Sequence, residues 1–168
     1  MKWFSLLLIL LLSISSTGQD SIKLHFLYGS KPAKGHKDSE AKHFGGLKGG
    51  HVNIEANGRV LDFLPGKCPI FPKNKKPSGG FYINRAASGN ESSNKTVTIV
   101  VPVSPDKLQA LEKVFDSVAQ KTPYDYAVFG MRCAAATYDV LSGVGLVKKI
   151  SNKTNVIKHF YPKLLRLT

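Results

Sequence analysis

The first half of the chain alternates apolar and polar residues in short runs separated by turn-forming residues, which is the pattern of β-strands. IKLHFLY at 22–28 predicts the first strand. HVNIEANGRVLDF at 51–63 contains two alternating runs around Asn57-Gly58, the pair preferred in a two-residue hairpin turn. FYINRAA at 81–87 and KTVTIVVPV at 95–103 predict two further strands, after a loop rich in Pro, Gly and Lys at 65–80.

The second half changes to helical spacing. Ser104-Pro105-Asp106 predicts a helix start with a capping hydroxyl, and Pro123 ends that helix. Its apolar residues recur three or four positions apart: Leu108, Leu111, Phe115 and Val118. A second helix is predicted from about Met131 to Ser142, with Gly143 stopping it.

The C-terminal segment TNVIKHFYPKLLRL is amphipathic and is interrupted by Pro162. A group of strands followed by a group of helices predicts an α+β domain, with an antiparallel sheet packed against helices.

The N-terminus has the order of a secretory signal peptide. Lys2 precedes an apolar run from Trp3 to Leu12, which is too short to span a bilayer, and small residues at Ser16 and Gly18 fit a cleavage site. We therefore expect residues 1–18 to be a cleaved signal peptide and residues 19–168 to form one secreted or periplasmic domain.

The net charge of the chain narrows the classes of binding partner. The 168 residues carry 24 basic and 11 acidic side chains, a formal charge of +13. Such a balance suits anionic partners such as cell-wall polymers or lipid head groups, and peripheral membrane contact is compatible with it. The basic residues are scattered along the chain, with KNKK at 73–76 as a short cluster and no motif typical of nucleic-acid binding, so we expect no specific nucleic-acid site.

The two cysteines have different settings. Cys68 lies in the predicted loop, whereas Cys133 falls at the start of a predicted helix beside Arg132. A helix N-terminus and an adjacent cation both favour a thiolate, the form that a nucleophilic cysteine needs. In an exported protein, a Cys68–Cys133 disulfide is an equal alternative.

A nucleophilic thiol also needs a histidine and a group that orients it. With the turn at Asn57-Gly58, Ala56 pairs with Arg59, Asn53 with Asp62 and His51 with Leu64, so that His51 and Asp62 share one face of the hairpin. Two polar residues on a solvated sheet face give the same pattern, and that interpretation stays open. The remaining histidines, His25, His36, His43 and His159, show no metal-ligand spacing, so we expect neither a metal nor another cofactor.

HVNIEANGRVLDF, followed about seventy residues later by YAVFGMRCAAATYDVLSGVGL, resembles the permuted papain-like branch of the NlpC/P60 superfamily, which includes lecithin retinol acyltransferase and its bacterial relatives. The resemblance implies a papain-like fold with His51 as the strand histidine, Asp62 as its orienting group, Cys133 as the nucleophile and Tyr126 bordering the substrate pocket.

The resemblance also implies an activity: an exported cysteine hydrolase or acyltransferase that acts on an amide or ester bond, with a cell-wall peptide favoured slightly over a lipid acyl ester. The alternative from another class is a non-catalytic basic binding domain stapled by a Cys68–Cys133 disulfide. The sequence leaves the oligomeric state open.

Overall fold

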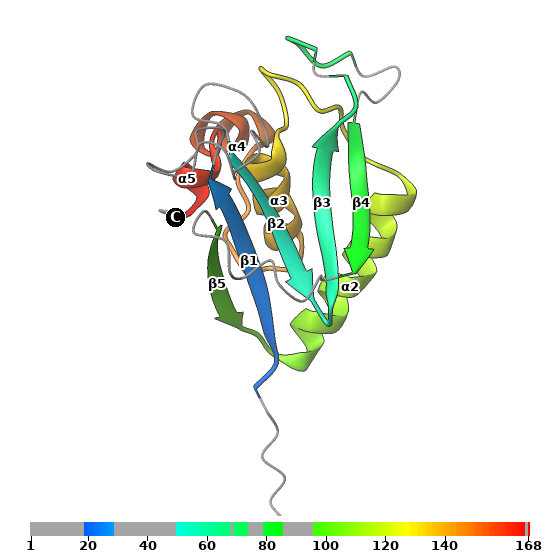
Figure 1. Cartoon of the computed structure of the whole chain (residues 1–168), viewed down its shortest axis with the longest axis vertical. Helices are drawn as coiled ribbons and strands as arrows, with labels where there is room; N and C mark the ends of the chain where they lie inside the picture. The colour runs from blue at the N-terminus through cyan, green and yellow to red at the C-terminus, as the bar shows by residue number, and fades with distance from the viewer. Residues whose placement is uncertain (1–18, 29–49, 68, 74–78, 86–95, 167) are drawn as a thin grey trace, which may run out of the picture.

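A computed structural model describes residues 19–28, 50–67, 69–73, 79–85, 96–166 and 168. The predicted signal peptide therefore lies outside the described residues. Five strands form one sheet in the order β4-β3-β2-β1-β5, and every neighbouring pair is antiparallel (Figure 1). The strands are β1 (Ser21–Tyr28), β2 (Gly50–Ala56), β3 (Arg59–Pro65), β4 (Gly79–Arg85) and β5 (Thr96–Pro102). With the helices that follow, the sheet confirms the predicted α+β class.

The β2–β3 hairpin turns where the sequence predicts it. Asn57 has φ 48° and Gly58 has φ 70°, the two left-handed conformations that a type I′ turn requires. The hairpin ladder pairs Ala56 with Arg59, as predicted, and continues to Ile54 opposite Leu61. The pairs predicted beyond that point, Asn53 with Asp62 and His51 with Leu64, lie outside the ladder, because the two strands diverge toward the far end of the hairpin (Figure 1).

β4 begins two residues earlier than predicted, at Gly79. The backbones of β3 and β4 come so close there that a Cβ on Gly79 would lie 2.2 Å from the carbonyl oxygen of Leu64. A glycine is therefore required for this approach. Gly79 and Gly80, which were predicted to belong to the loop, are the first two residues of β4.

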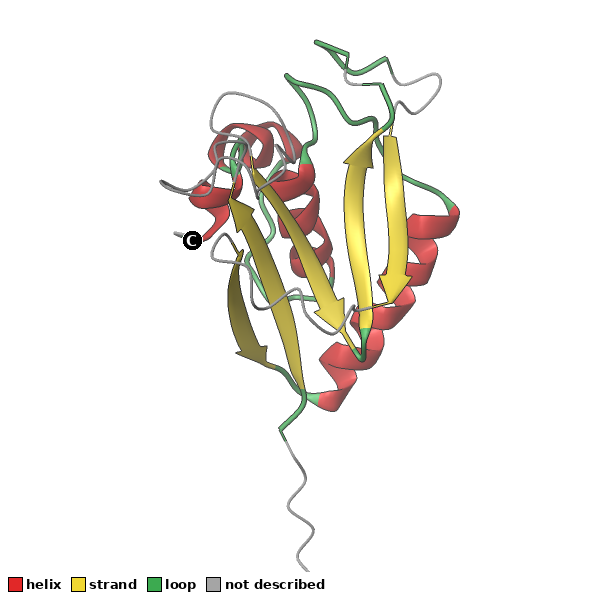
Figure 2. Cartoon of the chain, viewed as in Figure 1, coloured by secondary structure: helices red, strands yellow, loops and turns green. Residues whose placement is uncertain are grey.

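The helices are α2 (Pro105–Gln120), α3 (Cys133–Gly143), α4 (Asn152–Lys158) and α5 (Pro162–Arg166). In Figure 2, α2 and α3 lie behind the sheet and cover the same face of it. α2 buries Leu108, Leu111 and Phe115, as the helical spacing predicts. Its N-cap is Ser104, but the predicted capping bond from the hydroxyl is not formed, and Pro105 at the first helical position sets the helix start.

α3 begins at Cys133, two residues later than predicted, because Met131 forms a bridge with Tyr126 and is held in an extended conformation. Gly143 is the last residue of α3 and does not stop it; the left-handed residue that follows is Gly145, with φ 69°. Pro162 separates the C-terminal segment into two helices by opening α5, and Ser151 caps α4 by accepting a hydrogen bond from the backbone of Thr154 at 3.2 Å.

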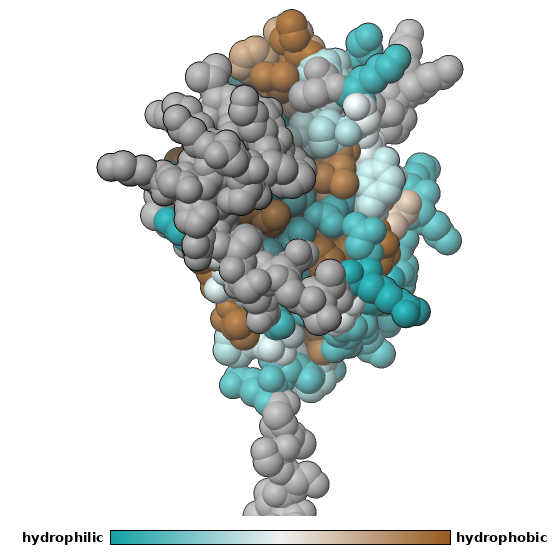
Figure 3. Space-filling model, in the orientation of Figure 1, coloured by the Kyte–Doolittle hydropathy of each residue, from teal (hydrophilic) through white to brown (hydrophobic). Residues whose placement is uncertain are grey.

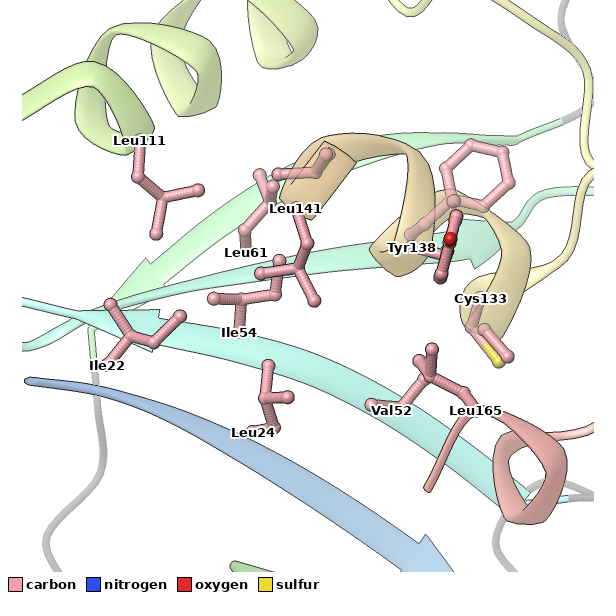
Figure 4. Packing of buried hydrophobic residues seen from close by; sticks show 14 of the residues in the cluster. Ile22, Leu24, Val52, Ile54, Leu61, Leu111, Cys133, Tyr138, Leu141 and Leu165 are labelled. Carbon is pink, nitrogen blue, oxygen red and sulfur yellow. The ribbon is translucent and has the colours of Figure 1, made fainter. Parts of the chain in front are cut away.

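The core lies between the sheet and the helices. Val52 and Ile54 of β2 and Leu61 and Phe63 of β3 are buried against α3, while the alternate residues of β2, beginning with His51, face the other side of the sheet. Figure 4 shows Ile54 and Leu61 beside Leu141 of α3, and Val52 beside Leu165 of α5. None of the helices in the described ranges is long and apolar enough to cross a membrane.

Candidate active site

The hairpin brings His51 and Asp62 together. His51 Nε2 lies 2.7 Å from Asp62 Oδ1, and both residues are buried, with exposed fractions of 4% and 8%. Because Nε2 is held by the carboxylate, the other ring nitrogen, Nδ1, is left to serve a further partner. The contact lies beyond the end of the β2–β3 ladder, where the two strands diverge, so the side chains of His51 and Asp62 connect the strands there.

Two asparagine amides fix the carboxylate of Asp62. Asn53 Nδ2 donates to Oδ1 at 3.0 Å, and Asn84 Nδ2 of β4 donates to Oδ2 at 3.1 Å. Burial alone would raise the pKa of Asp62, but the hydrogen bonds from His51 and Asn53, the charge of His51 and the bond from Asn84 outweigh it and lower that pKa. Asp62 is therefore ionised and held in one orientation.

Cys133 occupies the first position of α3 and is a free thiol with an exposed fraction of 3%. Figure 4 shows it at the start of the helix, next to the core residues. Its Sγ lies 3.9 Å from the carbonyl oxygen of Gly50, the residue before His51. The alternative hypothesis of a Cys68–Cys133 disulfide requires Cys133 to be bonded, and in the structure it is free. Cys68 itself lies outside the described residues.

The thiol and the imidazole change each other's protonation. Burial disfavours the thiolate, but the hydrogen bond and charge of His51, the backbone N–H of Val52 and the charge of Arg132 outweigh it and lower the pKa of Cys133. Burial also disfavours the imidazolium, but the hydrogen bonds and charges of Asp62 and Cys133 raise the pKa of His51 to about 9. The pair is therefore stabilised as thiolate and imidazolium near neutral pH.

The first turn of α3 supplies further polarity. The backbone N–H of Ala136 is bonded to the carbonyl of Arg132 at 2.8 Å, and the N–H groups before it belong to the helix N-terminus, where no intrahelical acceptor exists. The guanidinium of Arg132 lies over the rings of Phe160 and Tyr161, with its Cζ 4.6 Å and 5.5 Å from their centroids. The cation next to the thiol is therefore held in place by stacking.

Tyr126 is buried in an aromatic cluster. Its ring lies 5.2 Å from that of Phe63, which in turn contacts Phe81 and Tyr124. These contacts lie on the helix-facing side of β3, whereas Asp62 faces the other side. The role of Tyr126 in binding substrate stays a prediction.

The same face of the sheet holds a second pair of histidine and carboxylate. His25 Nε2 lies 2.8 Å from Glu55 Oε2, and His25 Nδ1 lies 2.9 Å from the hydroxyl of Thr98 on β5. Lys23 Nζ reaches the other oxygen of Glu55 at 3.4 Å. Alternation along the predicted hairpin puts Glu55 on the same face as His51, but no spacing rule joins it to His25.

Of the other histidines, His36 and His43 lie outside the described residues, and His159 binds Asn155 and stacks on Tyr138. Within the described ranges, no three side chains of His, Cys, Asp or Glu are grouped so that they could hold a metal ion.

Sequence reasoning missed Asn84. It lies in a predicted strand, and alternation places it on the same face as Tyr82, but the loop between β3 and β4 is too long to fix their register from sequence. In the structure, Asp62 is opposite Tyr82 and Val60 is opposite Asn84, so Asn84 is a diagonal neighbour of Asp62.

Comparison of the chain with models of known protein families, with curated proteins and with solved structures finds no match in any of the three.

Proposed function

We propose that this chain is a cysteine hydrolase or acyltransferase that cleaves an amide or ester bond, with Cys133 as nucleophile, His51 as general acid and base, and Asp62 as the group that orients His51. One observation carries the proposal: a free thiol at a helix N-terminus and a buried carboxylate act on the same histidine, and the pKa values of thiol and imidazole are shifted toward the ion pair.

In the first half-reaction, the Cys133 thiolate attacks the carbonyl carbon of the substrate and forms a C–S bond, while the carbonyl π electrons move onto oxygen. The backbone N–H of Cys133, at the start of α3, stabilises that oxyanion. When the intermediate collapses, the bond to the leaving amine or alkoxide breaks, and the His51 imidazolium gives the leaving group its proton.

In the second half-reaction, the neutral His51 takes a proton from water or from an acceptor hydroxyl or amine as it attacks the thioester. The C–S bond then breaks, and thiolate and imidazolium return. Asp62 stays ionised throughout, keeps Nδ1 aimed at the reacting atoms and stabilises the charged ring. Water as the acceptor gives hydrolysis, and another acceptor gives acyl transfer.

A permuted papain-like fold is part of the proposal. The antiparallel sheet, the histidine at the beginning of a central strand, the carboxylate on the adjacent strand and the cysteine at a later helix start agree with it. We propose an exported enzyme, with an anionic cell-wall peptide as first substrate and a lipid acyl ester as second, because the charge of +13 favours both.

The test is to trap the acyl-enzyme. The purified chain from Gln19 onward is mixed with a cell-wall peptide, or with an activated acyl ester, and quenched in acid; intact-mass spectrometry should find the acyl group on Cys133. Cys133→Ala should take up none, and Val100→Ser, an exposed change on β5, should take up as much as the parent. If the untreated protein is already disulfide-bonded and resists thiol reagents, the binding-domain alternative replaces the enzyme.

A further inference from the structure

Large apolar side chains are exposed at the end of the molecule where β3 finishes and α3 begins. Ile70, Phe71 and Phe129 have exposed fractions of 61%, 66% and 58%, and Phe160 is half-buried beside them. We call these four residues the end patch. Figure 3 shows apolar surface at the top of the view, over the loop that follows β3 in Figure 1.

Three segments that are far apart in the sequence build the end patch. The backbone N–H of Phe129 donates to the carbonyl of Ile70 at 2.8 Å, which ties the loop after β3 to the segment before α3. The rings of Phe71 and Phe129 lie 5.6 Å apart, and those of Phe129 and Phe160 lie 6.5 Å apart. The exposed rings are therefore displayed by a backbone that is fixed by hydrogen bonds, and they form one surface.

The end patch adjoins the candidate active site. Phe129 comes four residues before Cys133, and Arg132 stacks on Phe160. The strand that carries Asp62 leads directly into the loop that carries Ile70 and Phe71. A surface that covers the end patch would therefore lie beside the N-terminus of α3.

The three segments of the end patch are entirely basic in their charged residues. Residues 66–73 contain two basic side chains, residues 126–132 one and residues 151–168 four, which makes seven, and none of these ranges contains Asp or Glu. The carboxylate nearest in sequence, Asp125, is buried and accepts a hydrogen bond from the backbone of Lys73 at 2.7 Å. The charged side chains of the three segments that build the end patch are thus all basic.

We propose that the end patch docks on an anionic lipid surface, with its aromatic side chains in the interfacial layer and its basic side chains at the head groups. Exposed aromatic rings in segments whose charged residues are all basic are the composition that binds such surfaces, since burial of the rings and attraction of the cations add. A second copy of the chain would oppose positive charge with positive charge. A polyanion without an apolar phase would leave Ile70, Phe71 and Phe129 exposed to water.

If the proposed function holds, docking would bring Cys133 to the lipid surface, where it would act on bonds within that surface or close to it. Only this consequence rests on the proposed function. Lipid binding itself does not depend on the thiol, so the two proposals can fail separately.

The test measures partition and not turnover. The chain from Gln19 onward is floated with vesicles of phosphatidylcholine alone or with 30% phosphatidylglycerol. We expect binding to the anionic vesicles, weaker binding at high salt and little binding to neutral vesicles. Phe71→Ser combined with Phe129→Ser should weaken binding to the anionic vesicles by about tenfold or more.

Two matched controls define the surface. Val100→Ser removes an apolar side chain with an exposed fraction of 56% on β5, and Lys113→Gln removes a cation from the exposed side of α2; neither should weaken binding beyond about twofold. Lys67→Gln combined with Lys73→Gln should weaken binding several-fold.

Folding of each variant is checked by circular dichroism. The proposal is overturned if the parent ignores anionic vesicles, or if the two-Phe variant binds like the parent. A dimer in sedimentation analysis that is lost in the two-Phe variant, without any vesicle binding, would assign the end patch to self-association and would also overturn it.

Discussion

The sheet carries two pairs of histidine and carboxylate whose hydrogen bonds are nearly equal in length. His51 and Asp62 are 2.7 Å apart, His25 and Glu55 are 2.8 Å apart, and both histidines are buried. They differ in the third group: His51 also interacts with the thiol of Cys133, whereas the second ring nitrogen of His25 meets the hydroxyl of Thr98 on a strand.

The comparison teaches that a buried pair of histidine and carboxylate does not by itself identify a site. A thiol at a helix N-terminus can be held as thiolate, whereas a threonine hydroxyl in the middle of a ladder has no comparable stabilisation of its anion. We therefore propose a catalytic role for His51 and a structural role for His25.

The largest effect is expected at the third group. Cys133→Ala should lower kcat by about a millionfold, because the covalent intermediate can no longer form. Thr98→Ala, the corresponding change at the other pair, should leave kcat within about threefold of the parent, since it removes one polar contact. Steady-state assays on the substrate found by acyl-enzyme trapping measure both. Equal losses from the two changes would contradict the assignment.

The next effect is expected at the histidines. His51→Ala should lower kcat nearly as much as Cys133→Ala, because in the proposed mechanism His51 moves the proton in both half-reactions. His25→Ala should instead lower the free energy of unfolding by about 1–3 kcal/mol and leave kcat little changed, since it removes the imidazole that both Glu55 and Thr98 contact. Urea unfolding and kcat are measured on both variants; a loss of kcat in folded His25→Ala would join the two pairs into one site.

Asp62→Asn should lower kcat by about ten-thousandfold and leave measurable activity, because the residue only orients the ring. The pH profile of kcat gives a sharper readout. In the proposed mechanism the His51 imidazolium protonates the leaving group, and it exists below the His51 pKa of about 9, so parent activity should fall as the pH rises through about 9.

Without the Asp62 carboxylate, the pKa of His51 falls, so this alkaline limb should move to lower pH in Asp62→Asn. Glu55→Gln is the matched control and should leave the limb in place. An unmoved limb in Asp62→Asn would mean that another group sets the protonation of His51.

The smallest effect is expected at the carboxylate clamp, the two asparagine amides of Asn53 and Asn84 that donate to Asp62. Asn84→Ala removes one amide donor from Asp62 on the exposed side of β4, and should lower kcat by about fivefold. Asn152→Ala, an exposed asparagine at the start of α4, serves as control and should have no effect. Rescue by Asn84→Gln, whose amide is one methylene further out, would support a hydrogen-bonding role; a parent-like Asn84→Ala would leave the clamp to Asn53.

The candidate site was predicted from sequence as far as its geometry is local. The left-handed pair Asn57-Gly58 fixes the turn, and the period of two then places His51 and Asp62 on one face, so their contact follows from residues 51–62 alone. Cys133 was predicted from the helix start that surrounds it. The contact between Cys133 and His51 required the resemblance, since no rule of spacing joins residues so far apart.

What escaped prediction depends on register or packing between distant segments. Asn84 needs the pairing of β3 with β4 across a long loop, and the pair of His25 with Glu55 needs the pairing of β1 with β2. The end patch needs three segments to meet, which neither charge nor hydropathy along the chain can reveal. The late start of α3 depends on the bridge between Tyr126 and Met131.

The tight turn at Asn57-Gly58 has a consequence for the order in which the protein folds. His51 and Asp62 are 11 residues apart and are joined by a hairpin, a structure that closes in microseconds, whereas Cys133 is 83 residues from Gly50, which it contacts. Closing the longer loop costs more chain entropy and waits for the packing of α3 on the sheet. We therefore expect the pair of His51 and Asp62 to form early and Cys133 to join it last, so that the thiol becomes reactive only in a chain whose core is complete.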